Sequence, residues 1–133
     1  ETGLDVFKRV LSQSDHQLAR IHAIWGLSQF ARLNSEHAAL LLPYLKDQDA
    51  EIRAQAPKWL GDVRYKEAGE ALVLLLKDEH SRAQFFAAEA LGRIAFEPAI
   101  NPLVELLVQN NDTDHYIRHA ASLALARIGK AEP

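Results

Sequence analysis

Cysteine is absent from this 133-residue sequence, which excludes disulfide bonds, thiolate zinc sites, cysteine nucleophiles and covalent c-type haem attachment. Methionine is also absent, so the sequence lacks a start residue and we expect it to be a piece of a longer chain. The longest apolar run, from Ala38 to Pro43, is far shorter than the roughly 20 residues that a membrane-spanning helix needs. We therefore expect no thiol chemistry and no membrane partner.

An excess of basic charge is also missing. The 18 acidic residues outnumber the 15 basic ones, and the formal net charge is −3. The basic residues are interspersed with acidic ones, whereas a nucleic-acid partner would require clustered Lys and Arg for its phosphates. Hydrophobic residues make up 48% and charged residues 25%, as in folded globular proteins. We expect one folded domain with no nucleic-acid partner.

The sequence does contain a fourfold internal repeat. Equivalent places in it are separated by 33, 31 and 34 residues, and they hold Arg20, Arg53, Gln84 and Arg118. A period of that length is typical of solenoids that stack pairs of helices. The aligned segments are LARIHAIWGLSQF (18–30), EIRAQAPKWLGDV (51–63), RAQFFAAEALGRI (82–94) and YIRHAASLALARI (116–128).

Two columns of the repeat hold a single residue type. An alanine stands three residues after each equivalent place, and a leucine stands seven residues after it. Both offsets fall on one face of a helix, so we expect the alanines to allow close helix packing and the leucines to enter the core. The alanines are Ala23, Ala56, Ala87 and Ala121, and the leucines are Leu27, Leu60, Leu91 and Leu125.

A second apolar pattern precedes each of these helices, with the i, i+3, i+4 spacing of another helix, as in Leu72-Leu75-Leu76. Good N-cap residues separate the two patterns, namely Ser14, Asp47, Asp78 and Asp112. The prediction is an all-α, right-handed α-solenoid in a single domain of residues 1–133. Its four helix pairs are expected at about 3–33, 34–64, 65–96 and 97–130. Pro43 and Pro57 should distort the second pair.

At these residues the sequence resembles the HEAT-like repeats of phycobilisome lyases. The shared pattern is Asp, a few residues, Val-Arg, two residues, Ala, three residues, Leu-Gly. It is matched by Asp47, Ile52-Arg53, Ala56 and Leu60-Gly61, and again by Asp78, Ala87 and Leu91-Gly92. The resemblance covers nearly the whole chain and implies a HEAT-type solenoid. It implies no particular activity, because proteins of unrelated function share this repeat.

A narrower resemblance lies in RIHAIWGLSQFARL, SRAQFFAAEALGRI and LLVQNNDTDHYIRHAASLALARI, the last with three extra residues before its second helix. These segments are similar to the HEAT segment of large exported bacterial proteins. Those proteins join a sugar-dehydrogenase-like β-propeller to a haem-binding c-type cytochrome domain. The resemblance implies an exported or periplasmic parent in which this segment connects and orients the other domains.

The repeated charges and the six histidines each have a functional and a structural explanation. The repeated arginines and aspartates could be ligand-binding charges, but we favour a ladder of contacts between units, because residues present in every repeat serve stacking. Gln84 replaces the arginine in the third unit, so that rung should be uncharged. His115 and His119 share a helix face but lack a third ligand, and we predict no metal site.

The outward face of the second helices is the candidate binding surface, expected on the concave side. Its aromatic and arginine content is typical of protein interfaces. The alternative is that Trp25 and Phe85 are covered by neighbouring repeats, as we expect for Trp59, which should be wedged between repeats. The candidate residues are Ile21, Trp25, Lys58, Phe85, Glu89, Arg93, His119 and Arg127.

The sequence thus predicts a scaffold or spacer that binds a protein partner or adjoining domains of the parent chain. No nucleophile elbow, phosphate loop or converging carboxylate pair is present, so we expect no enzymatic activity, no catalytic residue and no cofactor. A HEAT-fold enzyme, either bilin-lyase-like or DNA-glycosylase-like, remains the alternative, although the low pI of about 6.1 opposes the glycosylase. The terminal units lack polar caps, which suggests self-association through the ends.

Overall fold

The computed structural model describes residues 1–131, and over that range every regular element is a helix. The first helices of the pairs are α1 (Gly3–Gln13), the 3-10 helix η1 (Ser35–Lys46), α4 (Gly69–Leu75) and α6 (Ile100–Asn110). Short 3-10 turns, η2 (Lys66–Ala68) and η3 (Glu97–Ala99), lead into α4 and α6. The second helices are α2 (Gln17–Leu33), α3 (Ala50–Asp62), α5 (Ser81–Arg93) and α7 (His115–Ala131). None of these helices is long and apolar enough to cross a membrane.

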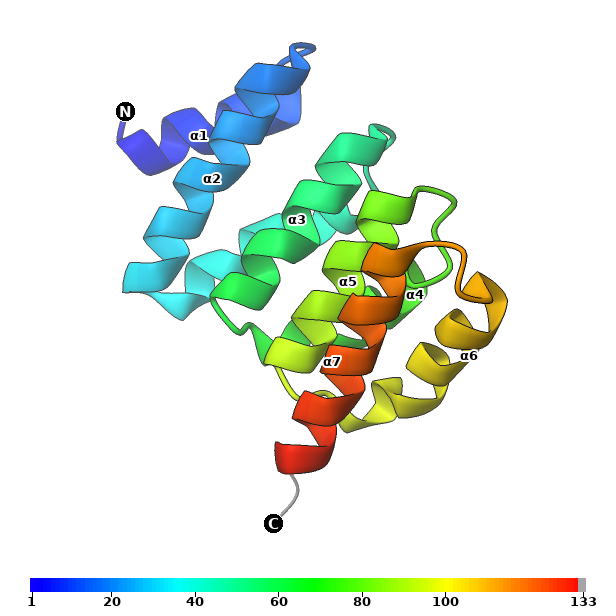
Figure 1. Ribbon diagram of the computed structural model, residues 1–133. Helices are drawn as coiled ribbons and strands as arrows, with labels where there is room; N and C mark the ends of the chain where they lie inside the picture. Colours follow the sequence, from blue (N-terminus) through cyan, green and yellow to red (C-terminus); the bar gives the residue numbers. More distant parts are fainter. Residues whose placement is uncertain (132–133) are drawn as a thin grey trace.

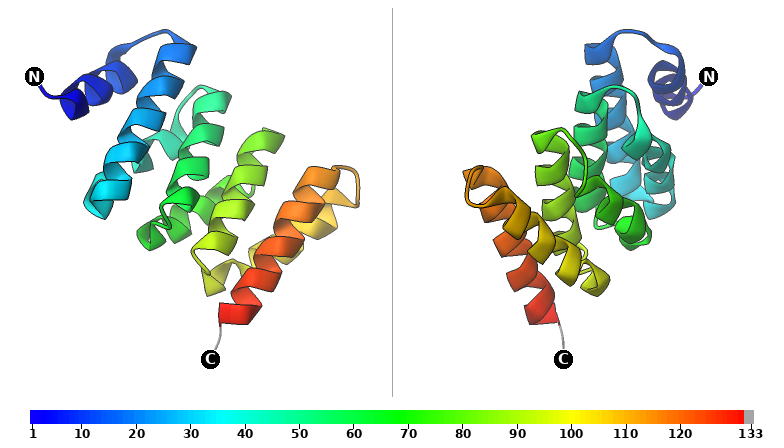
Figure 2. Two further views of the ribbon diagram at one scale, coloured as in Figure 1. Left: turned by 60° about the vertical axis from the view of Figure 1, so that its left-hand side comes forward. Right: turned by 90° about the vertical axis from the view of Figure 1, so that its right-hand side faces the viewer.

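The four second helices form one layer and the first helices form another behind it. Figure 1 shows α2, α3, α5 and α7 following one another across the molecule, with the two termini at opposite ends of the stack. The same order is visible in both views of Figure 2. Helix α3 packs on α5, and α5 packs on α7. This arrangement confirms the predicted all-α solenoid.

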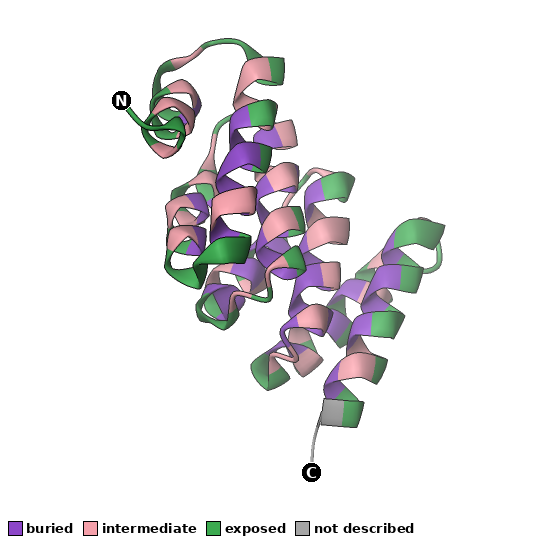
Figure 3. Ribbon diagram, turned by 90° about the vertical axis from the view of Figure 1, so that its left-hand side faces the viewer, coloured by how far each residue is buried: buried purple, intermediate pink, exposed green. Residues whose placement is uncertain are grey.

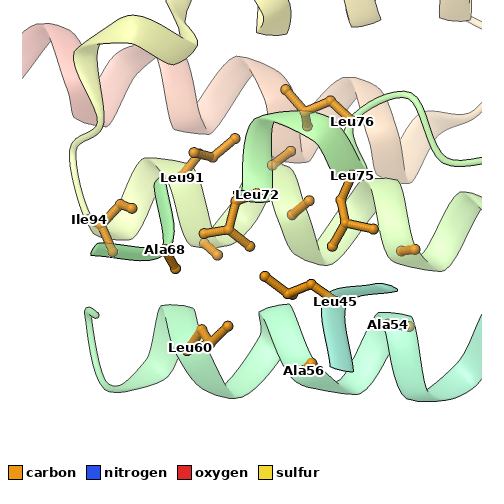
Figure 4. Packing of buried hydrophobic residues seen from close by; sticks show 14 of the residues in the cluster. Leu45, Ala54, Ala56, Leu60, Ala68, Leu72, Leu75, Leu76, Leu91 and Ile94 are labelled. Atoms are coloured by element: carbon orange, nitrogen blue, oxygen red, sulfur yellow. The ribbon is translucent and has the colours of Figure 1, made fainter. Parts of the chain in front are cut away.

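The core runs continuously between the layers. The alanine column is at most 1% exposed in every unit, and Leu27, Leu60 and Leu91 of the leucine column are equally buried. Figure 4 shows how Leu60 of α3 and Leu91 of α5 meet Leu72 and Leu75 of α4 across the space between the helices. In Figure 3 the buried residues lie on the sides of the helices that face their neighbours, and the exposed ones lie on the outer edges.

Glycines set the spacing between the second helices of the later units. A Cβ atom added at Gly61 would lie 2.7 Å from the Cα atom of Ala90 in α5. A Cβ atom added at Gly92 would lie 2.7 Å from the Cα atom of Ala124 in α7. Real Cβ atoms are not found that close to a backbone atom, so any larger residue would push the helices apart.

The junction between α2 and α3 is built differently. The repeat places Ser28 where the second and third units have Gly61 and Gly92, and Trp59 where the third and fourth units have Ala90 and Ala124. Ser28 is fully buried and its hydroxyl donates to the carbonyl oxygen of Trp25. Helix α3 contacts α2 much less than it contacts α5, and the two helices stand visibly apart in Figure 1. By the repeat, Trp59 takes the position at which Ala90 and Ala124 meet the preceding helix, so its larger side chain is our explanation for the wider spacing, and the wedge stays a prediction.

The predicted N-caps are misplaced by two residues. The side chains of Ser14, Asp47 and Asp78 accept the amide hydrogens of the residues two places later, so they shape the turns before the helices. The helices themselves begin after His16, Asp49 and His80, and the carboxylate of Asp114 accepts the first amides of α7. Both positions suit short oxygen-bearing side chains, and the sequence pattern does not separate them.

Arginines tie consecutive units together, as the ladder predicts. Arg20 of α2 binds Asp47 of the next unit with an N–O distance of 2.7 Å, and Arg53 of α3 binds Asp78 at 2.8 Å. The hydrogen bond from Arg20 holds the pKa of Asp47 below its ordinary value, against the opposing effect of partial burial. Partial burial raises the pKa of Asp78, but hydrogen bonds from Arg53 and from the His80 amide outweigh it, and that pKa is also lowered.

The ladder loses its charge in the third unit. Gln84 donates to the carbonyl oxygen of Leu76 at 3.1 Å, just as Arg20 donates to that of Leu11 at 2.9 Å. The glutamine thus keeps the bond to its own unit without reaching the next one. Asp112 instead pairs with Arg118 of its own unit, where both side chains are exposed.

Distortion of the second pair is confirmed in its first helix. Residues 35–46 form a 3-10 helix that contains Pro43, whose ring nitrogen has no hydrogen to donate. Pro57 is fully buried within α3, which continues through it as an α-helix. The disruption is therefore confined to η1.

Candidate functional site

The predicted surface residues are spread over all four second helices. Trp25, with 49% of its surface exposed, lies on α2 in the first unit together with Ile21, while the others lie on α3, α5 and α7. Lys58 and His119 are also exposed. The remaining candidates are half-buried, namely Ile21, Phe85, Glu89, Arg93 and Arg127. The wide α2–α3 junction lies between these two residues of α2 and the other six.

Contacts within the stack already engage several of the predicted charges. Glu89 pairs with Arg93 one turn further along α5, at 3.4 Å. The Cδ atom of Arg127 lies 3.5 Å from the position that a Cβ atom at Gly92 would occupy, so its stem lies against the α5–α7 contact. These three residues are less available to a partner than the sequence suggested.

The structure gathers a different group, which we call the aromatic–cation cluster. Its rings stand edge to face: the centroids of Phe85 and Phe86 are 5.0 Å apart, and those of Phe85 and Tyr116 are 6.4 Å apart. Both flanking cations reach Phe86, with the Lys58 Nζ atom 5.8 Å and the Arg82 Cζ atom 5.4 Å from its centroid. The cluster consists of Lys58, Trp59, Arg82, Phe85, Phe86 and Tyr116.

An open cavity of about 350 Å³ adjoins this cluster, between the first turns of α5 and α7. The rings of Phe85, Phe86 and Tyr116 supply most of its wall, and Tyr116 is 76% exposed. Arg82 and Asp114 stand on the α5 and α7 sides of the cavity. The cavity has the size of small-molecule or side-chain pockets and is apolar with a few polar groups, as binding sites usually are.

The charged side chains around the cavity differ in whether another group of the protein already pairs with them. Arg82 binds Glu51 of α3 at 2.9 Å, and its own side chain remains 53% exposed. The Asp114 carboxylate accepts the amide hydrogens of Tyr116 and Ile117 and thereby caps α7. Lys58 lies over the Trp59 ring, 4.9 Å from its centroid, and forms no ion pair with the described residues. Lys58 is therefore the cation most available to a ligand.

Sequence reasoning found Phe85 and Lys58 but missed Arg82, Phe86 and Tyr116. All the residues predicted for the binding surface stand one, five or nine residues after the equivalent place of their repeat. The missed residues stand at other offsets: Arg82 and Tyr116 lie two residues before the equivalent place, and Phe86 lies two residues after it. The adjacent pair Phe85-Phe86 was the available signal, because two large rings in succession cannot both enter one side of a helix.

The chemistry of this arrangement is that of recognition. Perpendicular rings and cations over ring faces attract through the aromatic quadrupole and through burial of apolar surface. Within residues 1–131 no three histidine, aspartate or glutamate side chains are grouped closely enough to hold a metal ion.

Two curated relatives are similar to this chain over about two thirds of its length. One is the phycocyanobilin lyase subunit alpha of Nostoc sp., 32% identical over 98 residues, which cover 67% of this chain and 34% of the relative. The other is the same subunit from Picosynechococcus sp., 33% identical over 91 residues, 62% of this chain and 33% of the relative. The chain thus spans about a third of the length of these relatives.

These relatives overturn the expectation that the chain belongs with non-enzymes. Both are named as subunits of a lyase, so the repeat occurs in enzymes as well as in scaffolds. The expectation was wrong because it treated the lack of a known catalytic motif as the lack of activity. The repeated columns specify stacking only, and they carry no information about chemistry performed by the unrepeated residues.

Solved structures share the architecture. Human deoxyhypusine hydroxylase in complex with glycerol superimposes with a TM-score of 0.76 at 22% identity, covering 98% of this chain and 44% of the hydroxylase. An engineered protein superimposes with a TM-score of 0.68 at 25% identity, covering 96% of this chain and 63% of the other. The family described as HEAT repeats matches residues 4–84 and 69–133. With its helix pairs, its stacking columns and these matches, the chain belongs to the HEAT-repeat family and is a helical repeat scaffold.

Proposed function

We propose that this scaffold binds an extended protein segment on the second-helix face of α3, α5 and α7. The observation that carries the proposal is the cavity of about 350 Å³ whose wall is formed by Phe85, Phe86 and Tyr116. Tyr116 is 76% exposed, although aromatic side chains dominate the binding energy of protein interfaces when they become buried. A bound segment that covers this ring removes apolar surface from water.

The free energy gained by covering the exposed ring of Tyr116 is large enough to support peptide binding. An aromatic side chain buries roughly 150–250 Å² when it is fully covered. At about 25 cal/mol per Å², covering the exposed part of Tyr116 contributes about 3 kcal/mol, which corresponds to a factor of about 150 in affinity. Ordering the peptide offsets part of that gain.

Selection from a random peptide library displayed on phage tests the proposal. Peptides recovered on the wild-type chain should bind Tyr116→Ala and Phe85→Ala at least tenfold more weakly, as measured by fluorescence anisotropy. Tyr116→Ala is the cleaner variant, because the ring is mostly exposed and its loss should leave the core intact.

Leu74→Ala is the matched control, because Leu74 is an exposed apolar residue, 63% exposed, on the first helix α4. Its replacement should leave peptide binding unchanged. Peptides that bind Tyr116→Ala as tightly as the wild type, or that lose binding equally with Leu74→Ala, would place the binding surface elsewhere and refute the proposal.

A second candidate function is a part in bilin attachment, favoured by the similarity to two phycocyanobilin lyase alpha subunits. The aromatic–cation cluster is compatible with it, because a bilin is a flat conjugated molecule with two carboxylates that Arg82 and Lys58 could pair with. Titration with phycocyanobilin should shift the visible absorption of the pigment, and Arg82→Ala should abolish the shift. An unchanged spectrum at saturating protein excludes this role for the segment.

A further inference from the structure

We infer that the occupant of the cavity is an acidic peptide segment that presents one bulky apolar side chain between carboxylates. The inference rests on the proposed function, since it specifies the ligand of the same surface. The geometry is an apolar cavity with one cation, Arg82 of α5, in its wall and a second, Lys58 of α3, beside its Phe86 ring. The cavity and the cations select different parts of one ligand.

The cavity selects the apolar side chain. Phe85 stands perpendicular to both Phe86 and Tyr116, with interplanar angles of 78° and 87°. Rings in this arrangement present edges and faces to the same space, which suits a phenylalanine, tyrosine or leucine side chain. The volume of about 350 Å³ leaves room for one such side chain and the adjoining backbone.

The cations select the carboxylates. Arg82 lines the cavity, and Lys58 lies outside the lining but reaches the same Phe86 ring from α3. A ligand backbone that leaves the cavity over Phe86 would therefore pass both cations. Glu51 neutralises Arg82 only, and Lys58 has no carboxylate partner among residues 1–130. A ligand carboxylate near Lys58 would complete the pairing without breaking any ion pair of the stack.

Asp114, on the wall opposite the cations, determines which way the acidic part of the ligand points. Asp114 lies on the α7 side of the cavity and is held there by the amides of Tyr116 and Ile117. Its negative charge disfavours a ligand carboxylate at that side, so the acidic flank should point towards α3. A cationic ligand, such as a methylated lysine in an aromatic cage, is disfavoured because Lys58 and Arg82 already occupy the approaches to Phe86.

Three fluorescein-labelled peptides separate these features. They are Gly-Ser-Asp-Phe-Asp-Ser-Gly, the variant with lysine for both aspartates, and the variant with alanine for phenylalanine. We expect the first to bind best by fluorescence anisotropy. The lysine peptide should bind at least tenfold more weakly. The affinity of the alanine peptide should fall about tenfold, because it has no ring to fill the cavity.

Variants of Lys58 test the charge assignment directly. Lys58→Ala should weaken the aspartate peptide about fivefold, since an exposed ion pair contributes up to about 1 kcal/mol, and Lys58→Glu should reverse the preference between the two charged peptides. Lys77→Ala is the matched control, because Lys77 is exposed beyond the end of α4, on the other layer. It should leave all three dissociation constants unchanged.

The outcomes distinguish this inference from the proposed function. If binding depends on Tyr116 but the aspartate and lysine peptides bind equally, the surface binds peptides and the acidic assignment is wrong. Tighter binding of the lysine peptide overturns the inference in favour of a cationic ligand. If all three peptides bind Tyr116→Ala as they bind the wild type, the proposed surface itself fails.

Discussion

Replacing Gly92 by alanine should destabilise the fold, even though alanine is the better helix former. The Cβ atom introduced in α5 would lie 2.7 Å from the Cα atom and 2.9 Å from the Cβ atom of Ala124, so α5 and α7 must separate. Overpacking of this kind costs about 1–3 kcal/mol, while the helix propensity of alanine returns about 1 kcal/mol. We therefore expect a net loss of about 1 kcal/mol in the free energy of unfolding.

Gly129 provides the matched control on α7, because a Cβ atom added there has no neighbour within 4 Å. Gly129→Ala makes the same chemical change without a steric clash and should raise the free energy of unfolding by up to about 1 kcal/mol. Urea denaturation followed by circular dichroism at 222 nm measures both. Both substitutions gain the same helix propensity, so the difference between their changes in the free energy of unfolding gives the cost of overpacking at Gly92. Equal stabilisation by both substitutions would show that the close approach of α5 and α7 does not limit packing.

Further predictions concern the ladder and the junction. The pKa values of Asp47 and Asp78 are lowered in the fold, so their contribution is complete above the ordinary value of 3.8 and is lost as the pH falls below it. Asp47→Asn should reduce the loss of unfolding free energy between pH 6 and pH 2, as measured by urea titrations at each pH. Arg20→Met should cost about 2 kcal/mol because its pair is mostly buried, whereas Arg118→Met, whose pair is exposed, should cost less than about 0.5 kcal/mol. Trp59→Ala should increase amide hydrogen exchange in α2 more than in α5 or α7, and uniform exchange would exclude a local role for this ring.

The repeat carries most of the fold in its sequence. A solenoid makes contacts between neighbouring units only, so one set of columns, copied four times, specifies nearly every packing interaction. The alanine column and the ladder from Arg20 to Asp47 were readable for that reason. The position of the helix starts was not, because an aspartate or serine serves equally in the turn and at the N-cap.

Only part of the candidate site could be predicted from the sequence. Periodicity identifies which helix face looks outward, but the cluster depends on how far each helix is shifted along its neighbour, which no periodicity encodes. Phe85 and Tyr116 come from different units and stand at different offsets within them, and only the packing of α5 on α7 brings their rings together. The ion pair between Glu89 and Arg93 was readable in principle, because residues four apart on a helix are neighbours, but the prediction treated both as free to bind a partner.

The wide junction between α2 and α3 affects the curvature of the whole stack. In a stacked array the overall curvature is the running total of small rotations, so one bulky side chain tilts everything that precedes it. That side chain is Trp59, and its indole ring also lies under Lys58 at the edge of the aromatic–cation cluster. We therefore expect a ligand that moves the ring of Trp59 to change the tilt of α2, which carries Trp25, relative to α3.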